Sequence, residues 1–290
     1  MHLNAETMPV VKGTTRVVGI IGNPIRHSLS PVMQNAAFSA ANLDYVYVPF
    51  AVEPDNLEQA VRGLRALGVC GFNVTIPHKT AIIPFLDQLD ETAESAGAVN
   101  TVLLTGTSMV GYNTDGDGLV DSLVRDLEFY PGEDQILVIG AGGAARGAIA
   151  ALCRAGARKI VICNRSLENA HSVQCDMTMR YPGTCIDVVE QNQVGKELLG
   201  ATSLLLNTTS LGMNGERIES IDFAHVPDHA KVYDMVYSRS GTPLVTASSA
   251  VGLRAVNGLG MLVAQGERAF SIWTGQKAPE GVMRLALDNI

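Results

Sequence analysis

The segment from residue 135 to residue 156 constrains the fold of this chain more than any other. Residues 136–139 form an unbroken apolar run of strand length, and the glycine-rich segment Gly140-Ala141-Gly142-Gly143-Ala144-Ala145 follows at once. An alanine-rich run of helical character comes next and ends at Gly156. The segment therefore predicts a strand, a tight turn and a helix in direct succession.

The glycine spacing in this segment matches the G-x-G-x-x-G/A pattern of dinucleotide-binding proteins. Gly140 permits the tight turn, Gly142 lets the backbone approach a pyrophosphate, and Ala145 is small enough for the helix to lie close to the strand. Backbone N–H groups at the positive end of a helix bind phosphate. Glycine loops also cap helices that bind no ligand, but the order strand, loop, helix favours a cofactor site. The predicted cofactor contacts in this loop are Gly140, Ala141, Gly142, Gly143 and Ala144.

The length and charge of the chain limit the kind of protein that it forms. A chain of 290 residues is long enough for about two domains, and a hydrophobic content of 47% is ordinary for a globular protein. The formal net charge is -8 with no run of like charges, so nucleic acid and anionic membrane are poor partners. The N-terminal segment lacks the pattern of a signal peptide, and no apolar run approaches the roughly 20 residues of a membrane span. We therefore predict a cytoplasmic protein.

The 5 cysteines show no C-x-x-C pair and no neighbouring histidine at ligand spacing. Most of them stand in apolar sequence, which predicts buried free thiols. We expect no disulfide bond and no bound metal.

The first part of the chain alternates between strand and helix patterns. Apolar runs bounded by turn residues predict strands, and an apolar period of three to four residues predicts helices. Ser30-Pro31 is typical of a helix start, with serine as the N-cap and proline at the first helical position. The predicted strands span residues 16–21, 45–50, 71–76, 98–104 and 109–112, and the predicted helices span residues 30–41, 54–67, 79–89 and 91–96. This order describes an α/β domain with an added strand pair.

The second part of the chain continues the alternation around the glycine loop. A predicted helix over residues 116–127 connects the first domain to the strand before the loop. Further strands are predicted over residues 159–163, 184–189, 203–206, 231–235 and 254–256, and further helices over residues 167–180 and 243–251. Such alternation is typical of a parallel, doubly wound sheet. The tail from residue 260 to residue 290 is predicted to form two helices separated at residues 275–279.

A series of short motifs, in a fixed order, connects the chain to a known family. They are HSLSP (27–31), NVTIPHK (73–79), AVNT (98–101), GYNTDG (111–116), GAGGAAR (140–146), NTTSLGM (207–213), DMVY (234–237) and NGLGMLVAQG (257–266). In these motifs the chain resembles the shikimate dehydrogenases of the shikimate/quinate dehydrogenase family, over nearly its whole length past residue 16. The resemblance implies an α/β fold with two domains. One is a discontinuous substrate-binding domain of residues 1–115 and 257–290, and the other is a Rossmann-type NADP-binding domain of residues 116–256.

The resemblance also assigns roles to individual residues. Lys79 and Asp115 match the catalytic pair, in which the lysine donates to the reacting oxygen and the aspartate keeps the ammonium in place. Ser28 and Ser30 match the hydroxyls that bind the shikimate carboxylate. The substrate-binding positions together are Ser28, Ser30, Thr75, Lys79, Asn100, Asp115, Tyr237 and Gln265. As alternatives, Ser30 could serve only as an N-cap, and Lys79 and Asp115 could form a surface ion pair. We expect His78 to be structural.

The end of the second strand in the cofactor domain indicates which dinucleotide is used. A NAD site usually carries an acidic residue about 20 residues after the glycines, where it binds the ribose hydroxyls. Here the strand ends in Asn164-Arg165-Ser166, and Arg165 matches the family's motif for the 2′-phosphate of NADP. Many members of the family have a second basic residue where this chain has Asn169, beside Glu168, so we expect NAD as a weaker alternative. The resemblance adds Asn164, Arg165, Ser166, Thr208, Met213, Val236 and Gly258 to the predicted cofactor contacts.

These matches imply the NADPH-dependent reduction of 3-dehydroshikimate to shikimate, in the biosynthesis of chorismate and the aromatic amino acids. The alternative within the family is a quinate/shikimate dehydrogenase with broader use of substrates and of NAD and NADP. A dinucleotide-binding regulator without catalysis is a third possibility, against which the presence of both Lys79 and Asp115 argues. We expect a small-molecule substrate as the partner, and a monomer or a homodimer.

Overall fold

The computed structural model describes residues 11–132, 134–238 and 241–290. Over these residues the chain divides into two compact units. Among the described residues, the first unit comprises residues 11–114 and Gln265–Ile290, and the second lies between Asp115 and Ala264. Each unit contains a 6-stranded sheet.

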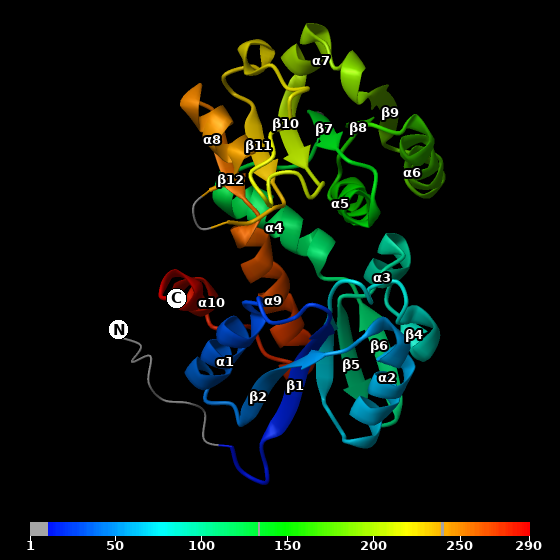
Figure 1. The fold of residues 1–290 in the computed structure, drawn as a ribbon, viewed down its shortest axis with the longest axis vertical. Helices are drawn as coiled ribbons and strands as arrows, with labels where there is room; N and C mark the ends of the chain where they lie inside the picture. Colours follow the sequence, from blue (N-terminus) through cyan, green and yellow to red (C-terminus); the bar gives the residue numbers. More distant parts are fainter. Residues whose placement is uncertain (1–10, 133, 239–240) are drawn as a thin grey trace. The chain divides into compact units, whose positions relative to one another are not determined.

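The sheet of the first unit has the strand order β2-β1-β3-β5-β6-β4 (Figure 1). Its strands are β1 (Arg16–Gly22), β2 (Tyr45–Ala51), β3 (Gly71–Val74), β4 (Gln88–Leu89), β5 (Thr101–Thr105) and β6 (Ser108–Tyr112). β1 pairs in parallel with β2 and β3, whereas β5 runs antiparallel to β3 and β6. The carboxyl ends of β1 and β3 and the amino end of β5 therefore lie at the same edge of the sheet.

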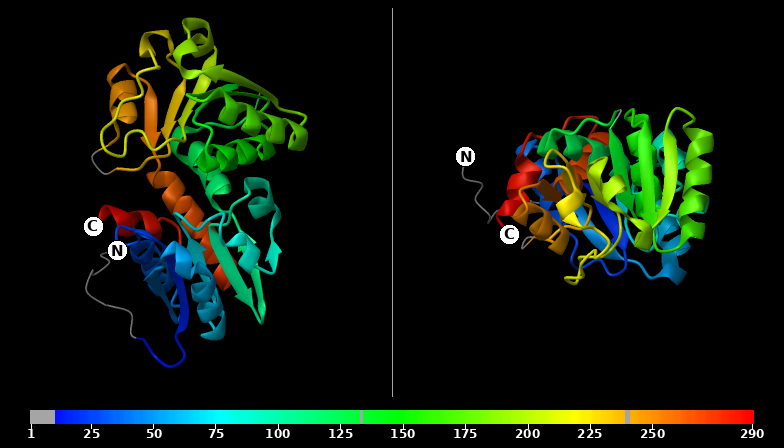
Figure 2. Two further views of the ribbon diagram at one scale, coloured as in Figure 1. Left: turned by 45° about the vertical axis from the view of Figure 1, so that its right-hand side comes forward. Right: turned by 90° about the horizontal axis from the view of Figure 1, so that it is seen from above.

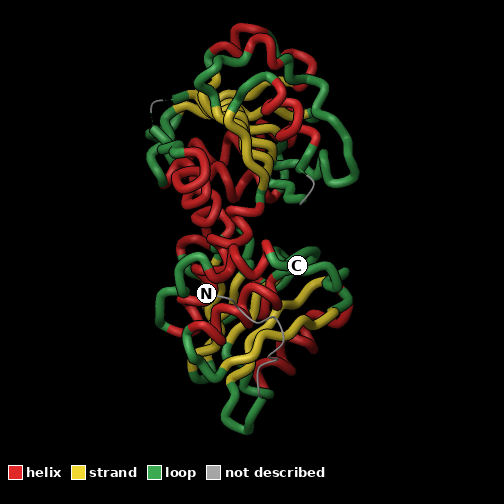
Figure 3. The backbone as a smooth tube through the Cα atoms, turned by 90° about the vertical axis from the view of Figure 1, so that its left-hand side faces the viewer, coloured by secondary structure: helices red, strands yellow, loops and turns green. Residues whose placement is uncertain are grey.

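Helices cover both faces of this sheet (Figure 3). On one face, α2 (Leu57–Ala66) buries Leu57, Val61 and Leu64 in a core that includes Phe72 and Val74 of β3. Along α2 these apolar residues are three or four positions apart, so they share one side of the helix. The remaining residues of α2 are polar or small, which is why only this side faces the sheet.

Aromatic residues fill the core on the other face. Phe38 of α1 (Ser30–Ala40) stacks on Tyr45 of β2 and on Phe270 of α9 (Leu259–Thr274), with ring centroids 5.0 and 5.1 Å apart. Nε1 of Trp273 in α9 donates to the carbonyl of Val102, at 3.0 Å. α10 (Val282–Asp288) packs beside α1, and α3 (Glu91–Ala96) precedes β5. The end of α9 is thus part of the first unit.

The predicted helix over residues 79–89 does not form. The chain instead runs through turns into a short 3₁₀ helix, Ile83–Phe85, and then into β4. Two long-range bonds account for this path: Val99 N donates to Lys79 O (2.8 Å), and Asp87 N donates to Met109 O (3.0 Å). Pro84 has no N–H to continue a helix from residue 80. Bonds to the segment before β5 and to β6 therefore override the local helical pattern.

The sheet of the second unit has the order β12-β11-β10-β7-β8-β9, and every pair of neighbours is parallel (Figure 2). Its strands are β7 (Gln135–Ile139), β8 (Lys159–Asn164), β9 (Cys185–Glu190), β10 (Thr202–Asn207), β11 (Lys231–Asp234) and β12 (Arg254–Asn257). The order changes direction between β7 and β10. In sheets of this kind, nucleotides bind at the carboxyl ends of the strands beside that point. The predicted doubly wound parallel sheet is confirmed.

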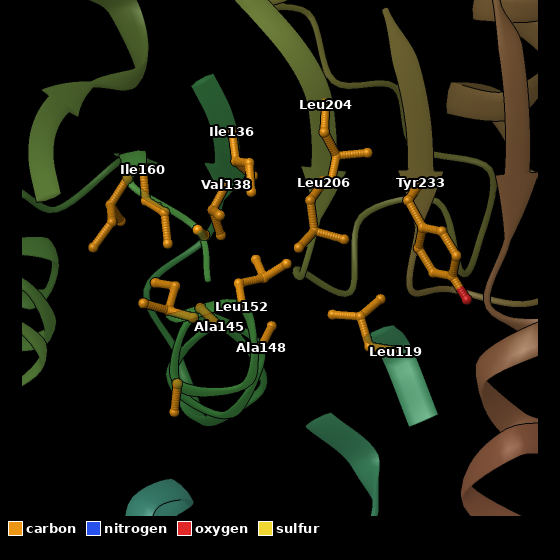
Figure 4. Packing of buried hydrophobic residues seen from close by; sticks show 14 of the residues in the cluster. Leu119, Ile136, Val138, Ala145, Ala148, Leu152, Ile160, Leu204, Leu206 and Tyr233 are labelled. Atoms are coloured by element: carbon orange, nitrogen blue, oxygen red, sulfur yellow. The ribbon is translucent and has the colours of Figure 1, made fainter. Parts of the chain in front are cut away.

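Helices cover both faces of the second sheet as well. α5 (Gly143–Arg154) places Ala145, Ala148 and Leu152 against Val138 of β7 (Figure 4). α4 (Asp115–Leu127) and α6 (Leu167–Arg180) bury their apolar sides in the same core. α7 (Lys196–Gly200) and α8 (Pro243–Ala250) contribute to the core on the opposite face. Ala145 is fully buried, as expected of the small residue that lets α5 approach β7.

The C-terminal boundary between the units differs from the prediction. Residues 257–264 belong to the second unit instead of the first. Gly260, in the first turn of α9, lies so close to Ser122 and Asp126 of α4 that a Cβ would not fit. Arg125 Nη2 donates to Gly260 O (3.0 Å), and Met261 N donates to the hydroxyl of Tyr233 (3.2 Å). These contacts attach the start of α9 to α4 and β11.

The expectation that most cysteines are buried is wrong. Only Cys163, in β8, is buried, whereas Cys70 and Cys153 are partly exposed and Cys175 and Cys185 are exposed. Cys175 lies on α6 and Cys185 begins the edge strand β9, so apolar sequence neighbours do not bury these side chains.

Some short elements have no clear sequence pattern. β4 and α7 were not predicted, and each contains too few residues to show a period. None of the helices in the described residues is long and apolar enough to cross a membrane.

Candidate active site

Predicted substrate-binding residues gather at one edge of the first sheet. Ser28 follows β1, Thr75 and Lys79 follow β3, and Asn100 directly precedes β5. Because β5 is antiparallel to β3, all of these positions lie at the edge formed by the carboxyl ends of β1 and β3. The other predicted substrate contacts divide between the units: Ser30 and Gln265 belong to the first, and Asp115 and Tyr237 to the second.

The segment after β1 positions the two serines differently. Ser28 is half-buried, and its Oγ accepts a hydrogen bond from Ser30 N (3.3 Å). Ser30 is buried, whereas Ser28 keeps part of its surface exposed. The N-cap of α1 is Leu29, with no side-chain cap bond. The N-cap prediction for Ser30 is therefore wrong, because Ser30 is already helical and its side chain turns inward.

A series of buried hydrogen bonds crosses the middle of the sheet. The hydroxyl of Tyr47 donates to Asn73 Oδ1 (2.7 Å), and Asn73 Nδ2 donates to Asn100 O and to Thr101 Oγ1, both at 3.0 Å. Burial raises the pKa of Tyr47 well above its usual range, so the hydroxyl keeps its proton and stays a donor. The backbone of Asn100 is thus supported by buried polar groups that extend to Tyr47.

A second set of bonds fixes the amide of Asn100. Its Oδ1 accepts from Thr101 Oγ1 (2.9 Å) and Thr114 N (2.8 Å), and its Nδ2 donates to Thr114 Oγ1 (2.9 Å). Because a backbone N–H only donates, the bond from Thr114 N identifies the amide oxygen. Thr114 Oγ1 also donates to Gln265 O, at 3.1 Å. The buried side chain of Asn100 therefore has one orientation, and Gln265 is attached to the same cluster.

Thr75 and Lys79 lie on a tight turn after β3. Thr75 N donates to Ile21 O (3.0 Å), and His78 N donates to Thr75 O (2.9 Å). His78 is buried, and its Nε2 lies 2.7 Å from the carbonyl of Val52. This contact attaches the turn to the segment after β2. His78 is thus occupied in supporting the backbone that carries Lys79, in agreement with the structural role predicted for it.

The glycine loop of the second unit begins where β7 ends. Gly140 has φ +111°, which side chains rarely adopt, and a Cβ there would lie 2.6 Å from Thr208 Oγ1. Gly142 is the N-cap of α5 in an extended conformation, and a Cβ on Gly142 or Gly143 would meet no heavy atom within 4 Å. The fold therefore requires glycine at position 140 but leaves space at the next two glycines. That space, at the start of a helix, fits a dinucleotide pyrophosphate.

Arg165 follows β8 at the same edge of the second sheet. Its side chain is exposed and, among the described residues, has no hydrogen-bond or ion-pair partner. Arg165 lines a cavity of about 520 Å³ together with Glu190 and Glu219. Glu168, which the sequence places near the predicted phosphate site, does not line this cavity. A guanidinium without a protein partner fits a 2′-phosphate, because its planar fork donates two parallel bonds.

A buried carboxylate organises the loops after β10 and β11. Asp234 Oδ1 accepts from Asn207 Nδ2 (2.8 Å) and Val236 N (3.1 Å), and Oδ2 accepts from Thr242 Oγ1 (2.6 Å). Burial raises the pKa of the Asp234 carboxyl, and these hydrogen bonds oppose that shift. Asp234 thereby attaches the end of β10, the segment after β11 and the N-cap of α8 to one another.

The remaining predicted cofactor contacts and the predicted substrate contact Tyr237 lie in segments that follow strands of the second sheet. Thr208 is buried, and its Oγ1 donates to the last carbonyl of β7, at 2.7 Å. The side chains of Met213 and Tyr237 are exposed, at 69% and 44%. Gly258 follows β12 and lies so close to Met235 O that a Cβ would not fit. The fold itself therefore accounts for threonine at position 208 and glycine at position 258, whereas the side chains of Met213 and Tyr237 are exposed and could contact a ligand.

Known proteins match the chain along most of its length. Residues 20–102 match the shikimate dehydrogenase substrate binding domain, residues 127–194 match shikimate / quinate 5-dehydrogenase, and residues 258–287 match the shikimate 5′-dehydrogenase C-terminal domain. A shikimate dehydrogenase (NADP(+)) of Geobacter sulfurreducens is 50% identical over 276 residues, which are 95% of this chain and 96% of the relative. The chain belongs to the shikimate dehydrogenase family.

Other members of the family agree with this placement. A shikimate dehydrogenase (NADP(+)) of Geobacter metallireducens is 51% identical and covers 94% of this chain and 96% of its own length. The solved structure of shikimate 5-dehydrogenase from Listeria monocytogenes, in complex with shikimate and NAD, superposes with a TM-score of 0.90 at 32% identity. It covers 97% of this chain and 99% of its own. The predicted family and the predicted α/β fold class are confirmed, and the roles of single residues stay predictions.

Several residues that shape the site in this family member were not predicted. Tyr47, Asn73, Thr114 and Asp234 hold predicted site residues in place through the buried bonds described above. Glu216 lies in the loop after β10. Its carboxylate accepts hydrogen bonds from its own backbone N–H, from the side chain and backbone of Asn214 and from Gly212 N, and these bonds lower its pKa to about 2. Asn73, Thr114 and Asp234 fall inside the motifs that carry the resemblance. A polar residue next to a buried strand in such a motif is therefore the sequence signal that could have identified these supporting residues.

Proposed function

We propose that this protein catalyses the reversible, NADPH-dependent reduction of 3-dehydroshikimate to shikimate. The observation that carries the proposal is the gathering of Ser28, Thr75, Lys79 and Asn100 at one edge of the first sheet. The second unit adds a glycine loop with open space at the start of α5. Relatives named shikimate dehydrogenase (NADP(+)), about half identical to this chain, support the same activity.

Ser28 and Ser30 bind the substrate carboxylate through their hydroxyls, and the ring hydroxyls meet Thr75, Asn100, Tyr237 and Gln265. The buried bonds from Tyr47 to Asn73 and onward to Thr114 fix the side chains behind this surface. Groups that already have one orientation lose less conformational entropy when the substrate binds. The arrangement therefore favours a small, rigid, polyhydroxylated acid.

Lys79 and Asp115 carry out the proton transfer. Bound NADPH supplies the hydride that adds to the carbonyl carbon. As that C–H bond forms, the carbonyl oxygen gains negative charge, and the Lys79 ammonium stabilises this charge and transfers a proton to the oxygen. In the direction of shikimate oxidation, the neutral amine of Lys79 accepts the hydroxyl proton. Asp115 matches the residue that keeps this ammonium in place in the family.

The second unit binds NADP at the carboxyl edge of its sheet. The segment from Gly140 to Ala144 meets the pyrophosphate with backbone N–H groups, and Arg165 meets the 2′-phosphate as a bidentate donor. Asn164 Nδ2 donates to Ser166 O (2.9 Å), which shapes the turn that presents Arg165. Thr208, Met213, Val236 and Gly258 complete the contacts. Thr208 and Gly258 contribute backbone atoms, since the hydroxyl of Thr208 already binds the end of β7.

Spectrophotometric assays of shikimate and quinate, each with NADP and with NAD, test the proposal. We expect the highest kcat/KM for shikimate with NADP. Comparable values for quinate would favour the broader quinate/shikimate dehydrogenase, and a folded protein without activity on either substrate would contradict the proposal.

Replacing Arg165 with alanine tests the cofactor assignment separately. One charge-assisted bidentate contact contributes roughly 1.5 to 3 kcal/mol, so its loss should reduce the preference for NADP over NAD by about 10- to 150-fold. The effect should appear mainly as a higher KM for NADP. A wild-type protein that favours NAD would overturn the role of Arg165.

The assembly and cellular location are separate parts of the proposal. We propose a cytoplasmic monomer or homodimer. Light scattering coupled to size-exclusion chromatography would distinguish the two states, and cell fractionation would test the location.

A further inference from the structure

The cavity beside Arg165 combines opposite charges at the carboxyl ends of β8 and β9. Asn164, the last residue of β8, is the register partner of Glu190, the last residue of β9. Paired strands lie roughly 5 Å apart, so Arg165 and Glu190 have their backbones side by side. Glu219, from the loop after β10, lines the same cavity of about 520 Å³. The cavity therefore carries one cationic and two anionic side chains.

These three charged side chains are not used in interactions with other described side chains. Within the described residues, Arg165, Glu190 and Glu219 form no hydrogen bond or ion pair with another side chain. The buried Oγ of Ser220, which also lines the cavity, has no hydrogen-bond partner. This set of unpaired polar groups around one cavity is suited to a ligand that carries both hydroxyls and negative charge.

We infer that Glu190 and Glu219 are specificity-determining residues that weaken the preference for NADP which Arg165 establishes. The inference rests on the proposed cofactor site. A carboxylate beside the adenosine ribose accepts hydrogen bonds from the hydroxyls of NAD and repels the 2′-phosphate of NADP. NAD sites usually carry this carboxylate at the end of the second strand, where this chain has Arg165. Here the neighbouring strand end and the loop after β10 supply carboxylates to the same cavity instead.

The size of the effect follows from Coulomb's law. A 2′-phosphate carries about two negative charges at neutral pH. One carboxylate roughly 8 Å from this phosphate, in surroundings with the dielectric constant of water, repels it. Without screening by salt, this repulsion raises the dissociation constant about sixfold. Replacing Glu190 or Glu219 with glutamine should therefore tighten the binding of a 2′-phosphorylated adenosine about three- to sixfold. The double replacement should tighten it by about the product of the two single effects.

Titration calorimetry of the protein without cofactor measures this directly. The probes are adenosine 2′,5′-bisphosphate and 5′-AMP, which differ only in the 2′-phosphate. The variants are Glu190→Gln, Glu219→Gln, their double replacement and Arg165→Ala. Glu168→Gln is the matched control, because it removes the same charge from the start of α6 but does not line the cavity. A gain in affinity cannot result from a failure to fold.

We expect tighter binding of the bisphosphate in both cavity variants, less than a twofold change in the control, and no gain for 5′-AMP. The gain should disappear in about 1 M salt, where the Debye length falls to roughly 3 Å. An equal gain in Glu168→Gln, an equal gain for 5′-AMP or no gain in either cavity variant would overturn the inference. The Arg165→Ala arm separates the two hypotheses: if bisphosphate binding is unchanged in that variant, the proposed cofactor site itself is wrong.

Discussion

Replacing Gly142 with alanine separates what the glycine loop does for the fold from what it does for the cofactor. Gly142 has φ −88° and ψ −170°, which any residue adopts, and a Cβ there would meet no heavy atom within 4 Å. Alanine is a poorer N-cap than glycine by up to about 1 kcal/mol, while the loss of backbone freedom in the unfolded chain contributes roughly 0.4 to 1 kcal/mol in the opposite direction. The free energy of unfolding should therefore change by less than about 1 kcal/mol.

The same methyl group should weaken NADP binding strongly. A phosphate oxygen that accepts from a backbone N–H lies about 2.9 Å from the nitrogen, whereas a methyl carbon keeps other atoms roughly 3.5 to 4 Å away. The pyrophosphate is then displaced from one or two charge-assisted hydrogen bonds, each worth roughly 1.5 to 3 kcal/mol. The dissociation constant for NADP should rise at least about 10-fold, and beyond about 100-fold if two bonds are lost.

Calorimetric titration with NADP and urea denaturation without cofactor measure the two quantities independently. Gly183→Ala is the control for adding a methyl group, because that glycine also has open space and no left-handed backbone. It should leave NADP affinity unchanged and change the free energy of unfolding by no more than about 1 kcal/mol. Gly140→Ala, unlike Gly142→Ala, should destabilise the folded protein. Its φ of +111° and the contact with Thr208 predict a loss of stability of roughly 1 to 3 kcal/mol. NADP affinity within twofold of wild type in a folded Gly142→Ala protein would refute the assignment of the loop.

Three further replacements test other parts of the molecule. Lys79→Ala should lower kcat by roughly 10²- to 10⁴-fold with a smaller change in shikimate affinity; a variant that keeps half of the wild-type kcat would remove Lys79 from the mechanism. Ser28→Ala should raise the KM for shikimate about 10-fold or more with little change in kcat, because contacts to a remote carboxylate serve the ground state and the transition state alike; Ser28 is a cleaner test than Ser30, which is buried, so that its replacement could also affect folding. Burial raises the pKa of Asp234, so its protonated form favours folding and this contribution is lost as pH rises above about 4. Urea denaturation should therefore show the wild type losing stability relative to Asp234→Asn over that range, and a difference that does not depend on pH would exclude the shift.

The sequence alone determined the parts of this protein that depend on neighbouring residues. The run from Gln135 to Gly156 gave a strand, a glycine turn and a helix, because an apolar run, a residue that tolerates positive φ and a helical period act within a few residues. The same local rules predicted the alternation that leads to a parallel sheet, and a parallel sheet brings the ends of its strands to one edge. The edges that carry Lys79 and the glycine loop were therefore predictable.

Tertiary structure decided the features that depend on residues far apart in the chain. The bond from Val99 N to Lys79 O holds a turn where the local pattern predicts a helix, and Ser30 is a buried residue of α1 instead of its N-cap. The cavity that joins Arg165 to Glu219 likewise depends on which loops meet beside β9. A buried polar group must find a partner wherever the fold provides one, and no local period records that choice. Local pattern thus specified the elements and their order, while long-range hydrogen bonding and charge specified how each side chain at the site is held.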